Sequence, residues 1–168
     1  MAAKRQMVIF RIGSEEFALD IMDTKEVVVM RGITPVPETD SYVEGVMNLR
    51  GSLVPVLDLR KRLRASGVCE GTDRRIIVSN LDGRRIGLIV DAASEVIRVS
   101  EEMIEPVPDI ITDVGVGYVT GIINLDERFI TMIDLRKALT DEITSDLDEV
   151  ARLLSRQEVV ANPVRAIL

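Results

Sequence analysis

Hydrophobic and polar residues alternate near the start of the chain in the way that a half-buried strand requires. In residues 7–12 Val8, Phe10 and Ile12 fall on one face of an extended segment, and residues 16–20 alternate with Phe17 and Leu19 on one face. The Gly13-Ser14 pair between the two segments supplies a tight turn. The sequence therefore predicts an antiparallel hairpin here.

The next apolar segment does not alternate. After a polar interruption at residues 23–26, the run Val27-Val28-Val29-Met30 places four apolar residues in succession. A strand that is apolar on both faces is expected to be covered on both faces. A partner protein is one candidate for the outer cover.

Shorter predicted strands follow, separated by turn signals. Arg50-Gly51 and Asp82-Gly83 are two-residue turns of the hairpin type, in which glycine supplies a positive φ. Pro55 lacks a backbone donor, so we expect it on a sheet edge or at a bulge. Further strands are predicted at residues 46–49, 53–57, 76–78, 86–90 and 94–99. Many short strands with such turns favour small antiparallel barrels.

Part of this pattern occurs twice in the chain. Residues 42–63 and 118–139 are identical at ten of 22 positions, at a constant shift of 76 residues. Upstream, residues 17–27 resemble residues 86–96 at a shift of 69. A repeat at a fixed period indicates duplication of one structural plan. We expect two half-size modules, about residues 7–71 and 72–140, whose mutual interface is part of the core.

The last segment, residues 141–168, has a different pattern. Leu147, Val150 and Leu154 fall at helical spacing, and Ser145 can cap the helix that they predict. Two interpretations remain for this amphipathic helix: its apolar face packs on the barrels, or it is an arm that binds a partner.

Composition limits the class of protein. The chain has 168 residues and is 46% hydrophobic, which excludes an intrinsically disordered chain. No apolar run reaches the roughly 18 residues that a membrane span needs. The amino-terminal residues lack the apolar core of a secretory signal. We therefore expect a cytoplasmic protein without direct membrane insertion.

The residue types that most site chemistry requires are scarce. The chain has no histidine and a single cysteine, Cys69, so Ser/His/Asp catalysis and an intramolecular disulfide are excluded. A net charge of −7 and 3% aromatic residues oppose nucleic-acid binding. We expect no enzyme activity, no metal and no cofactor. An RNA-binding barrel stays as a distant alternative, which a salt titration with single-stranded RNA would test.

The two copies of the repeat differ in charge at one turn. The first copy carries Arg50-Gly51, whereas the second carries Asp126-Glu127. Either the two turns meet different partners, or exposed turn residues vary freely. Asp58 and Asp134 occupy the same position in each copy, and we expect them to cap short helices rather than to bind ligands.

Three segments carry a recognisable pattern: FRIGSEEFALDIMDTKEV, GVMNLRGSLVPVLDLRKRL and RRIIVSNLDGRRIGLIVDAASEV. Together with Pro106-Val107-Pro108-Asp109 and residues 118–121, they resemble the bacterial CheW family, over about residues 7–140. The resemblance implies two similar five-stranded SH3-like barrels packed together, and no catalysis. It also implies an adaptor that couples methyl-accepting chemoreceptors to the histidine kinase CheA, in chemotaxis or in a parallel chemosensory system governing pili or development.

The resemblance also implies which residues meet these partners. Receptor-binding positions, in a groove between the barrels, carry over to Glu26, Val27, Asn48, Arg50, Gly51, Ile86 and Gly87. An apolar groove suits a receptor helix, with Val27 and Ile86 as its wall and Arg50 as a donor. The position of kinase binding carries over to Asp109 and Ile110 on a barrel end, where another CheW-like domain would also dock. Val28-Val29 stands where family members often have Arg-Gly, which makes this rim more apolar.

Overall fold

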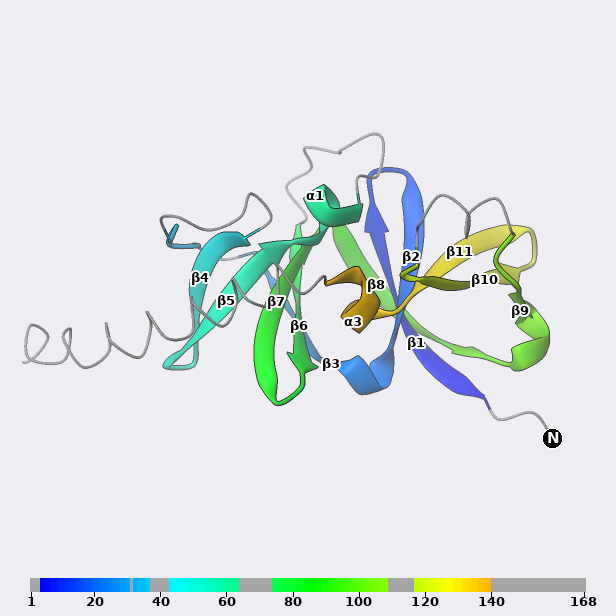
Figure 1. Ribbon diagram of the computed structural model, residues 1–168, viewed down its shortest axis with the longest axis horizontal. Coiled ribbons are helices and arrows are strands. Elements are labelled where there is room, and N and C mark those ends of the chain that lie inside the picture. The colour runs from blue at the N-terminus through cyan, green and yellow to red at the C-terminus, as the bar shows by residue number, and fades with distance from the viewer. Residues whose placement is uncertain (1–3, 31, 37–42, 64–73, 109–116, 140–168) are drawn as a thin grey trace, which may run out of the picture.

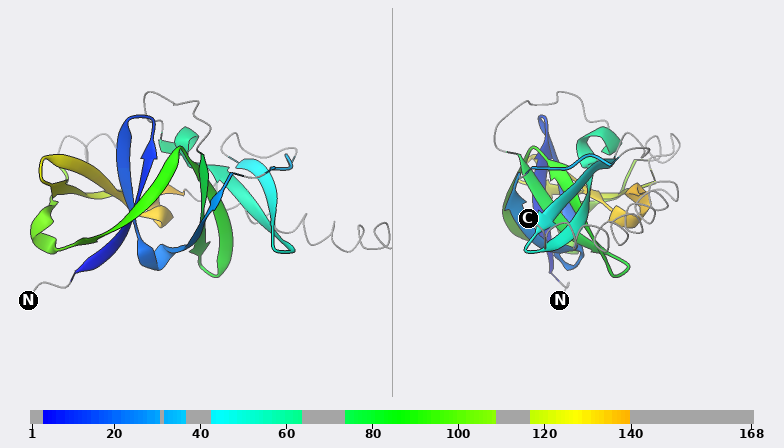
Figure 2. Two further views of the ribbon diagram at one scale, coloured as in Figure 1. Left: turned by 180° about the vertical axis from the view of Figure 1, so that it is seen from behind. Right: turned by 90° about the vertical axis from the view of Figure 1, so that its left-hand side faces the viewer.

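The computed structural model describes residues 4–30, 32–36, 43–63, 74–108 and 117–139. Within these residues the fold consists of two curled sheets, each forming an SH3-like barrel, which lie side by side (Figures 1 and 2). The predicted fold class, mainly β with two packed SH3-like barrels and short helices, is confirmed, and one barrel has six strands where five were expected. Cys69 and the predicted carboxy-terminal helix lie outside the described residues.

The six-stranded barrel has the strand order β8-β1-β2-β11-β10-β9. Its strands are β1 (Arg5–Ile12), β2 (Glu15–Asp20), β8 (Ala92–Val99), β9 (Ile104–Glu105), β10 (Val119–Leu125) and β11 (Arg128–Ile133). Two 3-10 turns, η1 (Ile21–Asp23) and η2 (Glu101–Met103), and the helix α3 (Leu135–Ala138) flank these strands. The hairpin predicted at Gly13 is β1–β2, with Phe10 paired to Phe17.

The five-stranded barrel has the strand order β3-β6-β7-β5-β4. Its strands are β3 (Thr24–Val29), β4 (Val43–Leu49), β5 (Ser52–Asp58), β6 (Arg75–Leu81) and β7 (Arg84–Val90), and the helix α1 (Leu59–Leu63) follows β5. The two barrels differ by β9, which pairs Glu105 with Ile122. In the five-stranded barrel, an isolated bridge pairs Thr34 with Val46. Val46 is the repeat counterpart of Ile122, so this bridge occupies the position that β9 has in the other barrel. The barrels therefore follow one plan.

Each barrel combines strands from both halves of the sequence. The hairpin β1–β2 pairs with strands of the second half, and β6–β7 pairs with strands of the first half. The joining ladders are parallel and equivalent: Val56 pairs with Gly87 in one barrel, and Met132 pairs with Ala18 in the other. The expected half-size modules therefore exchange their hairpins, and neither half forms a barrel alone.

Three apolar clusters account for the core. Met7, Ile123 and Ile130 belong to a cluster within the six-stranded barrel, and a second cluster lies within the five-stranded barrel. The third cluster contains residues of both barrels, including the stacked pair Phe10 and Phe17, whose ring centroids are 5.6 Å apart. The barrels thus share a continuous apolar contact, as the repeat predicted.

Two expectations about strands need correction. The strand β3 begins at Thr24, so Thr24, Lys25 and Glu26 belong to it. Of the apolar run, Val28 and Met30 pack on the core, whereas Val27 and Val29 are exposed. Pro55 lies in β5, an interior strand rather than an edge. The ladder from β5 to β7 begins only at Val56, so Pro55 is beside a single neighbouring strand, β4, and its missing donor costs no ladder bond to β7.

Candidate protein-interaction site

The turn between β4 and β5 presents an arginine at the end of the five-stranded barrel. Arg50 and Gly51 both have positive φ, of 50° and 86°, as a two-residue hairpin turn requires. Asn48 closes the turn because its Oδ1 accepts a hydrogen bond of 2.9 Å from the Gly51 N–H. The Arg50 side chain is 66% exposed. The predicted turn is confirmed, and its geometry directs a cation into solvent.

Arg50 forms an ion pair with Glu26 of β3, in which Nη2 donates to Oε2. The Glu26 hydrogen bond and charge raise the pKa of Arg50 above its ordinary value. Val27 follows Glu26 in β3, and its side chain lies on the opposite, exposed face of the strand. The fold therefore brings together four of the predicted receptor-binding residues, which are Glu26, Asn48, Arg50 and Gly51, and presents Val27 on the same edge strand.

The other two predicted receptor-binding residues lie in the interior. Ile86 is 0% exposed and belongs to the cluster shared by the barrels. Gly87 is buried on β7, where an added Cβ would lie 2.9 Å from Ile76 Cγ2. β7 lies between β6 and β5, and apolar clusters cover both of its faces. The expectation that Ile86 forms the wall of a surface groove is therefore wrong for this structure.

Asp109 and Ile110, the predicted kinase-binding residues, lie outside the described residues. Their position stays a prediction. Asp134 is placed as expected: its side chain caps α3 by accepting a hydrogen bond of 3.3 Å from the Lys137 N–H.

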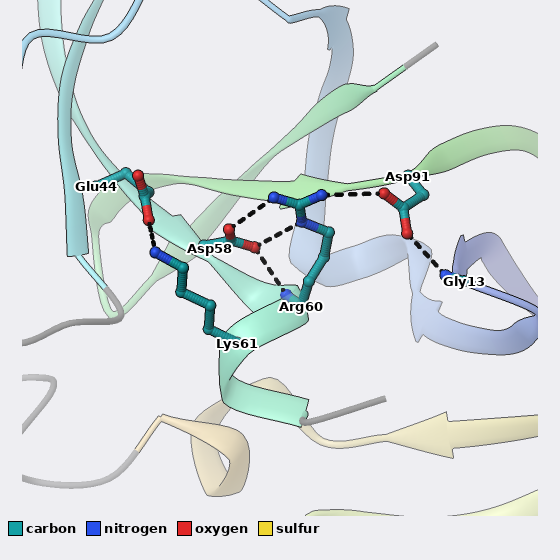
Figure 3. A network of polar contacts seen from close by, with 6 residues as sticks. All are labelled: Gly13, Glu44, Asp58, Arg60, Lys61 and Asp91. Atoms are coloured by element: carbon teal, nitrogen blue, oxygen red, sulfur yellow. Dashed lines mark hydrogen bonds and ion pairs between the residues drawn. The ribbon is translucent and has the colours of Figure 1, made fainter. Parts of the chain in front are cut away.

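Asp58 has a larger role than the helix cap that the sequence predicted. Its Oδ1 accepts a hydrogen bond of 3.0 Å from the Arg60 backbone N–H, at the start of α1. The same carboxylate also holds the Arg60 guanidinium through Nε and Nη2, each at 3.0 Å (Figure 3). Hydrogen bonding to Asp58 is the main reason that the pKa of Arg60 is raised.

Arg60 also reaches the other barrel. Its Nη1 lies 3.2 Å from Oδ1 of Asp91, the residue between β7 and β8 (Figure 3). The second oxygen of Asp91 accepts a hydrogen bond of 2.7 Å from the N–H of Gly13, in the β1–β2 turn. Because Asp58 and Asp91 are buried, this network is a polar link inside the contact between the barrels. Sequence reasoning missed Arg60 and Asp91, although Arg60 recurs as Arg136 in the repeat.

The six-stranded barrel has its own arginine clamp. Arg128 of β11 donates to Glu16 of β2 and to Glu95 of β8. Glu95 is the repeat counterpart of Glu26, so in each barrel an arginine of the hairpin holds a glutamate on an edge strand. The bonds from Arg128 lower the pKa of Glu16. Arg128 forms ion pairs with two carboxylates, whereas Arg50 forms its ion pair with Glu26 and is more exposed. The two clamps therefore present different charges to solvent.

Comparison with known proteins identifies the family. The CheW-like domain model matches residues 6–142. The chain belongs to the CheW-like domain family. Chemotaxis protein CheW of Klebsiella aerogenes is 33% identical over 148 residues, which are 88% of this chain and 89% of that protein. Probable chemotaxis protein CheW of Rhizobium etli is 37% identical over 145 residues, which are 84% of this chain and 91% of that protein.

A solved structure shows the same fold. The crystal structure of scaffolding protein TtCheW from Thermoanaerobacter tengcongensis matches with a TM-score of 0.74 at 38% identity, covering 84% of this chain and 96% of that one. The suggested CheW resemblance is therefore confirmed, and the chain is a scaffold of chemosensory signalling. In the described part of the chain, no helix has the length and apolar character that a bilayer crossing needs.

Proposed function

We propose that this CheW-like chain is a non-catalytic adaptor that couples methyl-accepting chemoreceptors to the histidine kinase CheA. The observation that carries the proposal is the ion pair of the exposed Arg50 with Glu26, which two distant segments of the chain bring together on one barrel end. The same edge strand also presents the exposed apolar side chain of Val27 on its other face. An amphipathic helix of a receptor tip has matching apolar anchors and carboxylates.

The ion pair prepares Arg50 for this contact. A guanidinium has five N–H donors, and the bond to Glu26 uses Nη2, so other donors remain for a receptor carboxylate or a carbonyl at a helix end. Glu26 restricts the long side chain before binding, which lowers the entropic cost of the complex. A charge-assisted hydrogen bond at a partly desolvated site contributes about 1.5–3 kcal/mol.

The remaining residues of the proposed receptor site support its shape. Asn48 and Gly51 hold the turn that presents Arg50. Ile86 and Gly87 act from the interior, because β7 pairs with β6, which in turn pairs with β3. Their contribution is the position of the edge strand rather than contact with the receptor.

The second partner in this proposal is the regulatory domain of CheA, or another CheW-like domain, at Asp109 and Ile110. Two separate contacts allow one molecule to connect two partners. Weak individual contacts suit an adaptor in a receptor array, because repeated contacts add avidity. Receptors would then hold the protein at the cytoplasmic face of the membrane.

Charge reversal at Arg50 tests the receptor contact. We expect Arg50→Glu to lower the affinity for a receptor cytoplasmic fragment by about tenfold or more, the loss that corresponds to 1.4 kcal/mol. Binding of the CheA regulatory domain should stay unchanged. Glu127→Lys, in the equivalent turn of the other barrel, is the matched control. If folded Arg50→Glu binds the receptor as well as the wild type does, Arg50 is not part of the site, and if the wild type binds neither fragment, the adaptor function is wrong.

A further inference from the structure

Met22 is the most exposed large apolar side chain among the described residues, at 82%. It lies in η1, where the chain passes from the six-stranded to the five-stranded barrel. The repeat counterpart of Met22, at the shift of 69 residues, is Asp91, which is buried at the other passage between the barrels. The fold can therefore bury this position, yet here it leaves a flexible thioether in water, where apolar surface is unfavourable.

The surroundings of Met22 are cationic. A cavity of about 430 Å³ is lined by Met22 together with Lys4, Arg5, Asp20 and Arg98. Asp20 is already used: one oxygen lies 3.1 Å from Arg5 Nη2, and the other accepts a hydrogen bond of 2.9 Å from the Met22 N–H. Within the part of the chain that the structure describes, neither Lys4 nor Arg98 has an ion-pair partner.

This charge is opposite to that of the whole molecule. The chain carries a net charge of −7, whereas the cavity has two unpaired cations beside an exposed methionine. The net negative charge attracts cationic partners at long range, whereas the local charge of this cavity favours an anionic one.

We propose that the cavity around Met22 docks an acidic segment of another protein, in which an apolar side chain covers Met22 and carboxylates bind Lys4 and Arg98. Arg5, Asp20 and Arg98 belong to the six-stranded barrel and Met22 to η1, whereas Glu26 and Arg50 lie on the five-stranded barrel. The cavity uses none of the residues of the proposed receptor site, so this proposal does not rest on that site.

Fluorescence anisotropy of the full chain with a labelled amphipathic peptide tests this proposal. The probe has glutamate at its polar positions and leucine at its apolar positions, and a second probe replaces every glutamate with lysine. We expect the wild type to bind the glutamate peptide alone, with an affinity that falls as salt rises. Arg98→Glu should weaken binding by about tenfold or more, since it replaces an attraction with a repulsion.

Met22→Ser separates the apolar contribution, because the Met22 side chain is exposed and its backbone N–H can still donate to Asp20, which caps η1. We expect it to weaken binding by at least about threefold, while Arg85→Glu, an exposed cation of β7 away from the cavity, has no effect. Equal binding of both probes, or binding that neither Arg98→Glu nor Met22→Ser reduces, would overturn the proposal. So would preferential, Arg98-dependent binding to vesicles of phosphatidylglycerol and phosphatidylcholine, which would assign the cavity to a lipid surface.

Discussion

Arg50 adopts a backbone conformation that does not favour arginine. Its φ of 50° lies in the left-handed region, which costs most L residues about 1–2 kcal/mol and is tolerated best by asparagine and aspartate. Two other hairpins have aspartate at the same turn position, Asp82 and Asp126, with φ of 52° and 48°. Turn chemistry alone therefore does not explain the arginine, whereas the proposed receptor contact would.

Arg50→Asn is expected to weaken receptor binding without destabilising the fold. Arg50→Asn relieves the left-handed strain but removes an exposed ion pair worth about 0–1 kcal/mol, so the free energy of unfolding should rise or stay within about 1 kcal/mol of the wild-type value. Receptor-fragment binding should nevertheless fall. Urea unfolding and a binding titration on the same preparation measure both quantities. A less stable variant with unchanged binding would contradict the assignment.

Glu16 predicts a dependence of stability on pH. Its pKa is lowered in the folded protein, mainly by hydrogen bonds from Arg128, so its contribution is fully present above the ordinary pKa of 4.5. That contribution is lost as the pH falls through the lower, folded-state pKa. We expect the stability difference between wild type and Glu16→Gln to be largest near pH 7 and to shrink in acid, as urea unfolding at several pH values would show. A difference that does not vary with pH would exclude this linkage.

Burial separates the predicted site residues that reach the surface from those that do not. Glu26 and Arg50 are charged, and unpaired burial of charged side chains is rare, so their place at or near the surface is expected from residue type. Ile86 was misplaced, although the run from Ile86 to Val90 is apolar except for Gly87, which is typical of a strand buried on both faces. This apolar run predicts burial of Ile86, in conflict with the surface role that the family resemblance implies.

At the scale of elements, local sequence patterns predicted the hairpin turns correctly but placed the start of the strand β3 too late. The turns at Gly13, Gly51 and Gly83 were predictable, because positive φ and alternation are properties of short segments. The start of β3 was not, because Lys25 was interpreted as an interruption. Lys25 is exposed on the same face as Val27 and Val29, and such a strand position accepts a charged residue without cost.

The helix cap at Asp134 gives a prediction at this scale. Asp134→Ala removes the acceptor for the Lys137 N–H, and loss of such a cap costs about 1 kcal/mol. Asp134→Asn retains a side-chain oxygen at the cap and should be within a few tenths of a kcal/mol of wild type. Thermal and urea unfolding of the three proteins would measure this order. Equal loss in both variants would show that charge, rather than capping, is the contribution of Asp134.

At the scale of the whole molecule, the duplication was readable from the sequence but the exchange of hairpins was not. Both copies have the same pattern, so either hairpin could pair within its own half or with the other half. The choice depends on long-range ladders, such as Val56 with Gly87, that join segments far apart in the chain. Local periodicity contains no information about that choice.

The network around Arg60 predicts how firmly the barrels are joined. Arg60→Met leaves the buried carboxylates of Asp58 and Asp91 without their cation, and breaking a buried pair in this way costs about 3–5 kcal/mol. Arg136→Met is the matched control in the repeat, because its ion pair with Asp82 is exposed and is worth about 0–1 kcal/mol. Urea unfolding of both variants measures the difference. Similar losses would show that the network does not stabilise the contact between the barrels.

The exchanged hairpins have a mechanical consequence. The chain passes from one barrel to the other twice, once through η1 and once at Asp91, so two covalent passages join the barrels in parallel. When a bound partner pulls on one barrel, both passages share the load, and each is anchored by strand ladders in both sheets. We therefore expect the two barrels to move as one rigid body under load.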